Sequence, residues 1–392
     1  MSRRVFTSAV LLLFVVMCCG IGVAATEKNN VRTTLFTKGD LLNDTENANL
    51  SQAFDSFRAP SLVEAKGVVV AIVEAHYKNT TDVHYVGLAA KSMKSDGGAW
   101  TNGTAIVFDH YDANISRLLS PTSIVDGGDI RVLVGGYGTS GAPLTDLADG
   151  YWKPRMAGGW ISNGSDGQLE FKWSPVLSTS GITYDFWGYG STDPKSFKQF
   201  LGGGGAGIQL DDGSYVLPTQ ALNKDKKRFS LVILARKTTY GWRTSNDMSD
   251  DDCIQPAVLE WKDKSLLMMT SCGDGSRRVY WSSGMGTWWT EEYDTLSRVW
   301  GNSRTRKGHG VQGGFVSATI GGQKVILVSQ PVYSGEAGKE AGRLHLWLTD
   351  LQRIYDFGPI SAGNENVAAS TLLYAADKTP SSKEPKDVKG KL

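Results

Sequence analysis

Two short apolar runs flank a pair of glycines in the segment Phe315-Val316-Ser317-Ala318-Thr319-Ile320-Gly321-Gly322-Gln323-Lys324-Val325-Ile326-Leu327-Val328-Ser329. Both runs are rich in β-branched residues, which favour the pleated and half-buried surface of a sheet. A Gly-Gly pair supplies the positive φ angles that a two-residue hairpin turn requires. The segment therefore predicts an antiparallel hairpin with strands at Phe315–Ile320 and Lys324–Ser329.

Similar runs recur along the chain, each bounded by Gly, Asp, Asn or Ser. They are Val68–Val73, Ile130–Gly135, Ser230–Ala235, Ala257–Trp261, Arg277–Trp281 and Arg343–Leu348. No stretch longer than about three turns has the spacing of an amphipathic helix, so the chain is predicted to be all-β. Hairpins spread over most of the 392 residues exceed an ordinary sandwich and favour a propeller.

The charge balance and the scattered polar motifs exclude several kinds of site. The chain has 41 Lys and Arg against 40 Asp and Glu, so it has no overall preference for nucleic acid. Five scattered His and the few Cys do not form a zinc site. The run Gly202–Gly205 lacks the ending of a phosphate loop and is expected to allow close strand packing. The basic cluster at Lys224–Arg228 is predicted to be a solvated hairpin tip. No cofactor, metal or nucleic-acid partner is predicted.

The N-terminus has the pattern of a secretory signal. Arg3 and Arg4 precede an apolar run from Ala9 to Cys19, and small residues follow at Val23-Ala24-Ala25. Residues 1–25 are therefore predicted to be a cleaved signal peptide, and an uncleaved anchor is the alternative. No other segment reaches membrane-spanning length. The Lys-rich C-terminus lacks the hydrophobic tail of a GPI signal, so the mature chain is expected to be secreted or at the cell surface.

Secretion fits two further features of the sequence. Asn-x-Ser/Thr sequons, which predict glycosylation, occur at Asn43, Asn49, Asn79, Asn102, Asn114 and Asn163. Once the signal peptide is removed, Cys253 and Cys272 are the remaining cysteines. A hairpin between Ala257–Trp261 and Ser265–Thr270 would place them almost opposite each other, which predicts a disulfide.

Several longer segments carry a resemblance to a known family. They are Ser56-Phe57-Arg58-Ala59-Pro60-Ser61-Leu62-Val63, Phe200–Gly207, Thr295–Gly301 and Leu346–Tyr355. On these segments the chain resembles the trypanosome trans-sialidase superfamily. The resemblance implies a six-bladed sialidase-type β-propeller, followed in the family by a lectin-like sandwich.

That resemblance also predicts the domain organisation. Residues 26–50 are expected to be an N-terminal lead-in, 51–377 the propeller and 378–392 a polar disordered tail. The chain is expected to stop before the sandwich and to leave the last blade incomplete. Two segments, Ser282–Trp289 and Asp96–Trp100, look like worn copies of the sialidase Asp-box, a hairpin-turn device with a packed Trp.

The chemistry of sialidases sets definite requirements. The substrate carries a carboxylate, so the family holds it with clustered arginines through bidentate, charge-assisted bonds. It uses a Tyr nucleophile with a Glu partner, in place of the two-carboxylate scheme of most glycosidases. An Asp acts as acid and base at the leaving oxygen.

The resemblance carries over to this chain only in part. Arg58 matches the first arginine and Asp82 matches the acid/base Asp, while Arg117 and Arg343 match further family arginines. Several family positions are lost: Ala369 stands for the Tyr, Gln255 for its Glu partner, Ser271 for the second arginine and Ser120 for a substrate-binding Asp. The third arginine aligns near Ala341, two residues before Arg343, so two of the three carboxylate-binding arginines are missing. Pro143, Leu144 and Lys339 stand where the family has aromatic acceptor-site residues.

These losses predict a protein without catalytic activity. Removal of a nucleophile typically lowers the rate by about 10⁴–10⁶-fold. Inactive members of the superfamily act as adhesins and variable antigens, so the expected partners are host cell-surface or matrix glycoproteins, with sialoglycans as a second class. The alternatives are an active sialidase or trans-sialidase that relies on Arg58 and Asp82, and a non-functional truncated gene copy.

Overall fold

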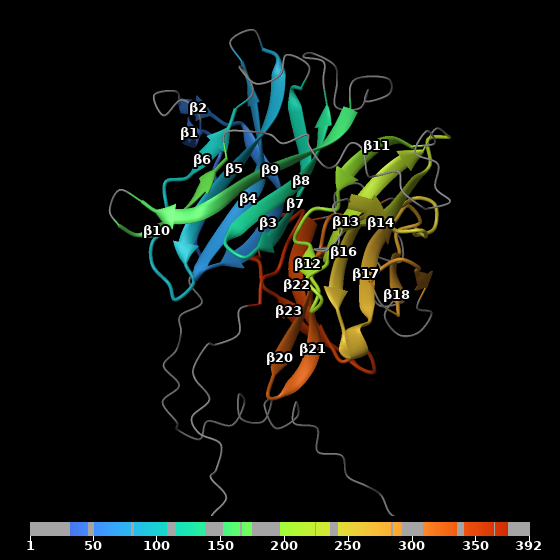
Figure 1. Ribbon diagram of the computed structural model, residues 1–392. Coiled ribbons are helices and arrows are strands. Elements are labelled where there is room, and N and C mark those ends of the chain that lie inside the picture. Colours follow the sequence, from blue (N-terminus) through green and yellow to red (C-terminus); the bar gives the residue numbers. More distant parts are fainter. Residues whose placement is uncertain are drawn as a thin grey trace, which may run out of the picture.

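The fold is described from a computed structural model of the chain (Figure 1). It describes residues 32–45, 51–79, 82–107, 115–137, 152–164, 167–174, 197–223, 225–235, 242–283, 285–291, 309–334, 341–363 and 365–374. The expected signal peptide and polar tail lie outside these ranges, as do Asn49, Asn114, Pro143, Leu144 and Lys339.

The described chain is built from strands, which confirms the all-β prediction. Its one helical element is a single 3₁₀ turn, Lys262–Lys264, at the tip of the hairpin between β16 (Cys253–Glu260) and β17 (Leu266–Cys272). Within the described residues there is no helix long and apolar enough to cross a membrane.

The strands form four sheets, and the first of them holds two successive β-meanders (Figure 1, blue to green). One meander comprises β3 (Ser56–Ala65), β4 (Val68–Lys78), β5 (His84–Lys94) and β6 (Thr104–Ile106), and the other β7 (Arg117–Asp126), β8 (Asp129–Tyr137), β9 (Trp152–Asn163) and β10 (Leu169–Trp173). The short strands β1 (Leu41–Asp44) and β2 (Ser51–Ala53) extend the first meander, because β1 pairs with β6. The folded sheet therefore begins within the segment that the sequence set apart as a lead-in.

The other three sheets follow in chain order. The third and fourth are four-stranded meanders, and the second has a fifth, short strand, β12, that pairs with β13. The second sheet contains β11 (Phe197–Gly202), β12 (Ile208–Gln209), β13 (Tyr215–Asn223), β14 (Arg228–Ala235) and β15 (Trp242–Thr244). The third contains β16 (Cys253–Glu260), β17 (Leu266–Cys272), β18 (Arg277–Ser282) and β19 (Thr290–Glu291), and the fourth β20 (Gly314–Ile320), β21 (Gln323–Ser334), β22 (Ala341–Thr349) and β23 (Ile354–Pro359).

The predicted hairpin around Gly321 and Gly322 forms with a two-residue turn. Ile320 lies opposite Gln323, and the turn residues Gly321 and Gly322 have φ angles of 58° and 76°. Both angles lie in the left-handed region that glycine adopts without steric cost. The strands at either side extend to Gly314 and Ser334.

Apolar faces of neighbouring sheets pack together to form the core. Leu267 and Met269 of the third sheet lie in one cluster with Phe315 and Val328 of the fourth. Trp289, the Trp of the worn Asp-box, is buried against Val232 and Tyr280. The inter-sheet packing is that of propeller blades, and the number of blades stays a prediction.

The glycine-rich segment Gly202–Gly205, which we call the glycine crossing, lies where strands of neighbouring sheets approach each other closely. A Cβ atom on Gly202 would lie 2.0 Å from the carbonyl oxygen of Ser120, and one on Gly203 would lie 2.5 Å from that of Pro256. Only a residue without a side chain fits such approaches of backbone to backbone. Close strand packing is thus the role of Gly202–Gly205, as the sequence predicts.

The segment 365–374 lies beside β20, next to the first sheet. The backbone N–H of Ser370 donates to the carbonyl of Gln312 at 2.9 Å. The side-chain amide of Gln312 donates at 2.7 Å to the carbonyl of Pro60. Through these bonds the last described segment, the fourth sheet and β3 meet at one point.

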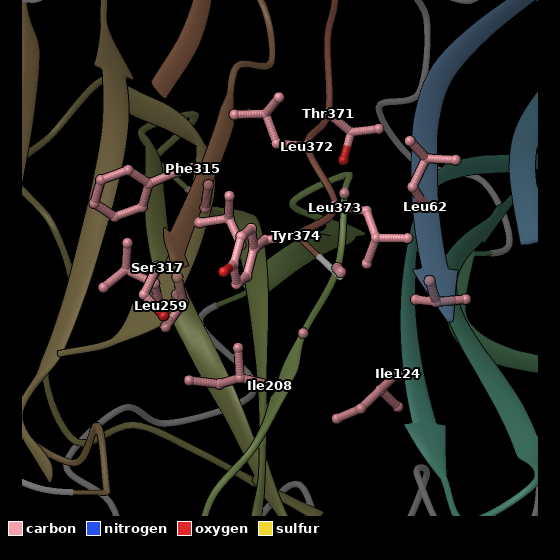
Figure 2. Close-up of a pocket in the computed structure, with 18 of the residues that line it drawn as sticks. Leu62, Ile124, Ile208, Leu259, Phe315, Ser317, Thr371, Leu372, Leu373 and Tyr374 are labelled. Carbon is pink, nitrogen blue, oxygen red and sulfur yellow. The ribbon is translucent and has the colours of Figure 1, made fainter. Parts of the chain in front are cut away.

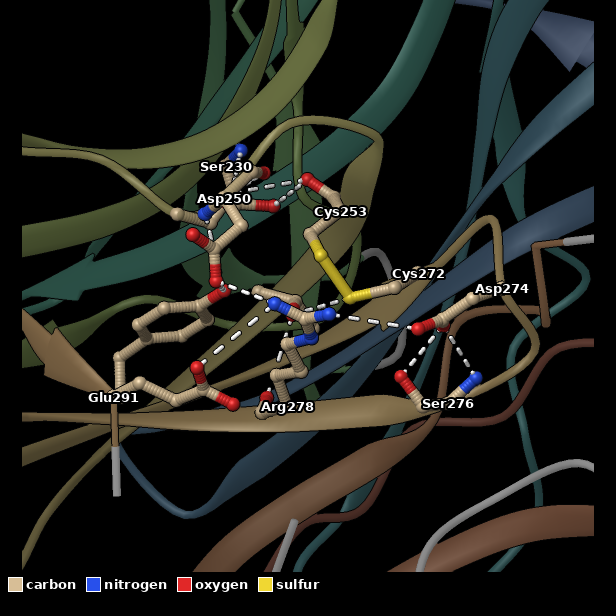
Figure 3. Close-up of polar contacts among 11 residues, drawn as sticks. Ser230, Asp250, Cys253, Cys272, Asp274, Ser276, Arg278 and Glu291 are labelled. Carbon is tan, nitrogen blue, oxygen red and sulfur yellow. Dashed lines mark hydrogen bonds and ion pairs between the residues drawn. A yellow bond between two sulfur atoms is a disulfide. The ribbon is translucent and has the colours of Figure 1, made fainter. Parts of the chain in front are cut away.

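The Cys253–Cys272 disulfide joins β16 to β17, and the two residues lie opposite each other in the ladder. Figure 3 shows the polar network beside it. Arg278 donates to Asp250 at 2.6 Å, and the hydroxyl of Tyr280 donates to the same carboxylate at 3.1 Å. Burial raises the pKa of Tyr280 above its ordinary value, so the phenol keeps the proton that it donates.

Candidate functional site

One pocket collects residues from most of the inner strands. It has a volume of about 520 Å³, and we call it the Arg58 pocket. Its lining residues are Phe36, Phe57, Arg58, Ala59, Pro60, Val73, Ser120, Gly203, Gln220, Gln255, Val311, Gln312, Ala368 and Ala369. Arg58 is the one charged residue among these described lining residues.

Three lining residues sit at equivalent irregularities of the inner strands. Ala59, Ser120 and Gln255 lie in β-bulges of β3, β7 and β16, and each precedes a proline. Their φ angles are 46°, 54° and 56°, which non-glycine residues rarely adopt. Bulges re-aim side chains and are frequent beside functional sites. The repeated bulge therefore builds the pocket wall.

Apart from Arg58 and the hydroxyl of Ser120, the polar side chains of the wall are amides. Gln220 accepts from the backbone N–H of Gln255 at 3.3 Å and donates to the carbonyl of Gly202 at 2.9 Å. The side-chain oxygen of Gln255 is buried without a hydrogen-bond partner among the described residues. An unsatisfied buried acceptor is costly, so this oxygen is a natural point for a donor on a bound ligand.

The structure brings four of the sequence-selected positions together. Arg58, Ser120, Gln255 and Ala369 all line the Arg58 pocket. They come from three strands and from the segment 365–374. They meet only when the sheets are packed side by side as the blades of the propeller, an arrangement that we call the ring of sheets.

The other selected positions lie elsewhere. Asp82 is exposed and forms an ion pair with Lys78 at 2.7 Å, and it is not among the residues that line the pocket. Ser271 is buried and accepts from the backbone N–H of Gly310 at 2.7 Å.

Arg117 is buried in β7, and burial lowers its pKa. Arg343 lies on β22, outside the pocket lining.

A buried arginine that the sequence argument did not select lies behind one wall. Arg277 is opposite Ser271 in the ladder of β17 and β18 and is 1% exposed. It donates at 2.8 Å to the carbonyl of Val311, a lining residue. Burial lowers the pKa of Arg277 to about 10, which leaves it cationic at neutral pH.

A group of titratable residues that the sequence did not indicate lies behind the part of the wall that Ser120 forms. Glu74 and His76 of β4 are both buried, and their side chains are 3.0 Å apart. Nδ1 of His76 lies 3.3 Å from Nε2 of His84 on β5. The other Glu74 oxygen accepts the backbone N–H of Ser120 at 2.6 Å. We call Glu74, His76 and His84 the histidine cluster. The i, i+2 spacing of Glu74 and His76 within an apolar strand was the available signal.

A second pocket has a volume of about 470 Å³. Figure 2 shows Thr371–Tyr374 lying between Leu62 of β3 and Phe315 of β20, with Ile124 and Ile208 nearby. No histidine, lysine or arginine lines it among the described residues. Its lining combines apolar packing surface with the carboxylates of Glu64 and Glu260 and the phenol of Tyr374.

The described sequons differ in their surroundings. Asn43, Asn102 and Asn163 are exposed. Asn79 is half-buried, and its side-chain oxygen accepts from the backbone N–H of Val83 at 2.9 Å.

The described lining residues of the Arg58 pocket provide groups that can hold a ligand. Its described lining residues include no Tyr, Glu, Asp or His. Within the same described part of the chain, no three His, Cys, Asp or Glu residues gather as metal ligands would. Arg58, the amides and two Phe rings provide a cation, hydrogen bonds and an apolar wall.

Comparison with known proteins identifies the family. A family model described as a BNR repeat-like domain matches residues 59–388. A sialidase from Trypanosoma cruzi is 35% identical over 316 residues, which cover 79% of this chain and 26% of the relative. Sialidase 85-1.1 of the same organism is 29% identical, covering 82% of this chain and 45% of the relative. The chain thus spans between about a quarter and a half of these curated relatives.

Solved structures agree with the sequence relatives. Trypanosoma rangeli sialidase in complex with sialic acid has a TM-score of 0.74 and 30% identity, covering 88% of this chain and 55% of that one. The same sialidase with 2,3-difluorosialic acid, as a covalent intermediate, has a TM-score of 0.75 and 31% identity, with the same coverage. Because the family model matches most of the chain and its homologues are trypanosome sialidases, this chain belongs to the BNR repeat-like family and has the sialidase-type β-propeller fold.

Proposed function

We propose that this chain is a catalytically inactive member of the sialidase superfamily that acts by binding glycoproteins. The observation that carries the proposal is the presence of Ala369 and Gln255 in the same pocket as Arg58. Alanine cannot form a covalent intermediate, and a glutamine amide cannot act as a base at neutral pH. A missing nucleophile alone lowers a rate by about 10⁴–10⁶-fold.

The proposed partners are glycoproteins of a host cell surface or matrix, with sialoglycans as a second class of ligand. A secreted or surface location is part of the proposal. It is supported by the N-terminal signal pattern and by the exposed sequons at Asn43, Asn102 and Asn163.

Hydrolysis and transfer assays with a fluorogenic sialoside test the catalytic half of the proposal. We expect no turnover above the uncatalysed rate from protein that shows a cooperative thermal melt, with Trypanosoma rangeli sialidase as the active control. A cooperative melt would also contradict a non-functional truncated copy. Turnover that disappears in Asp82→Ala would overturn inactivity and establish the enzymatic alternative.

Capture on immobilised host-cell and matrix glycoproteins tests the binding half. We expect binding above that of a glycosylated control protein, and a decrease in Arg58→Ala if the Arg58 pocket takes part. Binding equal to the control across several preparations would contradict the adhesin role.

A further inference from the structure

The histidine cluster is a continuous hydrogen-bonded chain behind the wall of the Arg58 pocket. Glu74 and His76 are 6% and 3% exposed, so water does not compete for their bonds. The rings of His76 and His84 are stacked, with centroids 5.3 Å apart. The cluster touches the pocket wall directly through the bond from Ser120 to Glu74.

The bonding pattern fixes which ring nitrogens carry protons. A carboxylate of Glu74 accepts, so Nε2 of His76 must donate to it. Nδ1 of the neutral His76 ring is then an acceptor, and Nε2 of His84 donates to it. Nδ1 of His84 is left as the basic nitrogen at the outer end of the chain.

This arrangement can accept one proton without losing a hydrogen bond. A proton that binds Nδ1 of His84 allows the Nε2 proton of the same ring to pass to Nδ1 of His76. His76 becomes an imidazolium that donates to both Glu74 and His84, and His84 is neutral again in its other tautomer. The net change is one added positive charge, held between the two partners of His76.

The groups that surround the cluster set the direction of its effect. Arg58 on β3 lies opposite Glu74, and Arg117 on β7 pairs with Val86 of β5. Both arginines repel a cation at His84, whereas Asp55 attracts one. Lys78, opposite His84 in the ladder, is neutralised by its pair with Asp82.

With the proton absent, the charge of Glu74 offsets part of the positive field of Arg58. With the proton present, the charges of Glu74 and His76 cancel.

We propose that the histidine cluster is a proton relay that strengthens the binding of carboxylate-bearing ligands at Arg58 when the pH falls. The proposal deepens the proposed function, on which it rests, because it assigns a regulator to the same pocket. One added charge close to a partly screened site changes anion affinity by about three- to tenfold.

Nitrogen-15 NMR of the imidazole rings tests the relay without any ligand. We expect the ring nitrogens of His76 and His84 to change together in one shared proton uptake, and Glu74→Gln to make that uptake less favourable. Titration of His84 alone, with the His76 nitrogens unchanged, would overturn the relay.

Calorimetric titration with N-acetylneuraminic acid as the carboxylate probe tests the effect on binding. We expect about three- to tenfold tighter binding at pH 5.5 than at pH 7.5, as one added charge predicts. That ratio should fall to about one in His84→Gln and persist in His345→Gln, whose ring pairs with Asp356 on the fourth sheet. Thermal melts verify that each variant folds.

The outcomes separate this inference from the proposed function. Binding without pH dependence, or with the same dependence in His84→Gln, overturns the relay and leaves an inactive binding protein intact. Absence of probe binding at both pH values also overturns the inference, because the relay is assigned to carboxylates. Turnover of the fluorogenic sialoside would instead contradict the proposed function.

Discussion

Backbone conformation at single residues shapes the wall of the Arg58 pocket. Ala59 has a φ angle of 46° although it carries a Cβ atom, a conformation that costs about 1–2 kcal/mol. Glycine adopts it freely but loses about 0.5–1 kcal/mol more than Ala through chain entropy. We therefore expect Ala59→Gly to raise the free energy of unfolding by about 0.5–1 kcal/mol.

Urea unfolding of a matched pair would measure this effect. The control is Ala53→Gly, on the exposed strand β2, where a normal φ angle leaves only the entropic loss. It should destabilise the protein by about 0.5–1 kcal/mol. Equal destabilisation by both substitutions would show that Ala59 is not strained.

Protonation of His84 predicts how stability depends on pH. Burial, followed by the nearby His76 and Arg117, lowers the pKa of His84 below its ordinary value of 6.5. Between these two pKa values the unfolded chain binds a proton that the folded chain does not. The free energy of unfolding should therefore fall as the pH drops below 6.5. His84→Gln should flatten this slope in urea unfolding at pH 7.5, 6.5 and 5.5, and an unchanged slope would contradict the shift.

At the scale of elements, close packing makes the glycine crossing sensitive to a single methyl group. A Cβ on Gly202 would lie 2.0 Å from the carbonyl oxygen of Ser120 and 2.5 Å from the hydroxyl of Thr122. Because backbone must move to admit it, Gly202→Ala should lower the free energy of unfolding by about 2–4 kcal/mol.

Gly363 provides the control for this substitution. A Cβ there would meet no atom within 4 Å, and the φ angle of Gly363 is not positive. Gly363→Ala should change the free energy of unfolding by less than about 0.5 kcal/mol. Similar melting temperatures for the two variants would mean that the crossing can relax.

Sequence patterns predict elements better than they predict the pocket. Alternation and turn residues identify hairpins such as Phe315–Ser329, because strand pairing there is local. The Arg58 pocket joins Arg58, Ser120, Gln255 and Ala369 across the ring, and no local pattern encodes that meeting. The family resemblance supplied these positions. It did not supply the histidine cluster, since Glu74, His76 and His84 depend on this chain's own side chains.

At the scale of the whole molecule, one side chain ties the ends of the described ring together. Gln312 donates to the carbonyls of Pro60 and Ser370, at 2.7 and 3.3 Å, and is buried. Gln312→Ala leaves these carbonyls unsatisfied and opens a cavity, so we expect a loss of about 2–4 kcal/mol.

Two further variants make this prediction sharp. Gln312→Glu keeps the shape but cannot donate while ionised, so its loss should be larger at pH 7.5 than at a pH below about 4, where a carboxyl of ordinary pKa is protonated and donates again. Gln323→Ala, exposed at the tip of the β20–β21 hairpin, should change stability by less than about 0.5 kcal/mol. Unfolding followed by tryptophan fluorescence distinguishes these cases. If Gln312→Ala unfolded at the same urea concentration as Gln323→Ala, closure of the ring would depend on the apolar contacts of Leu372 and Leu373 beside β3 and β20.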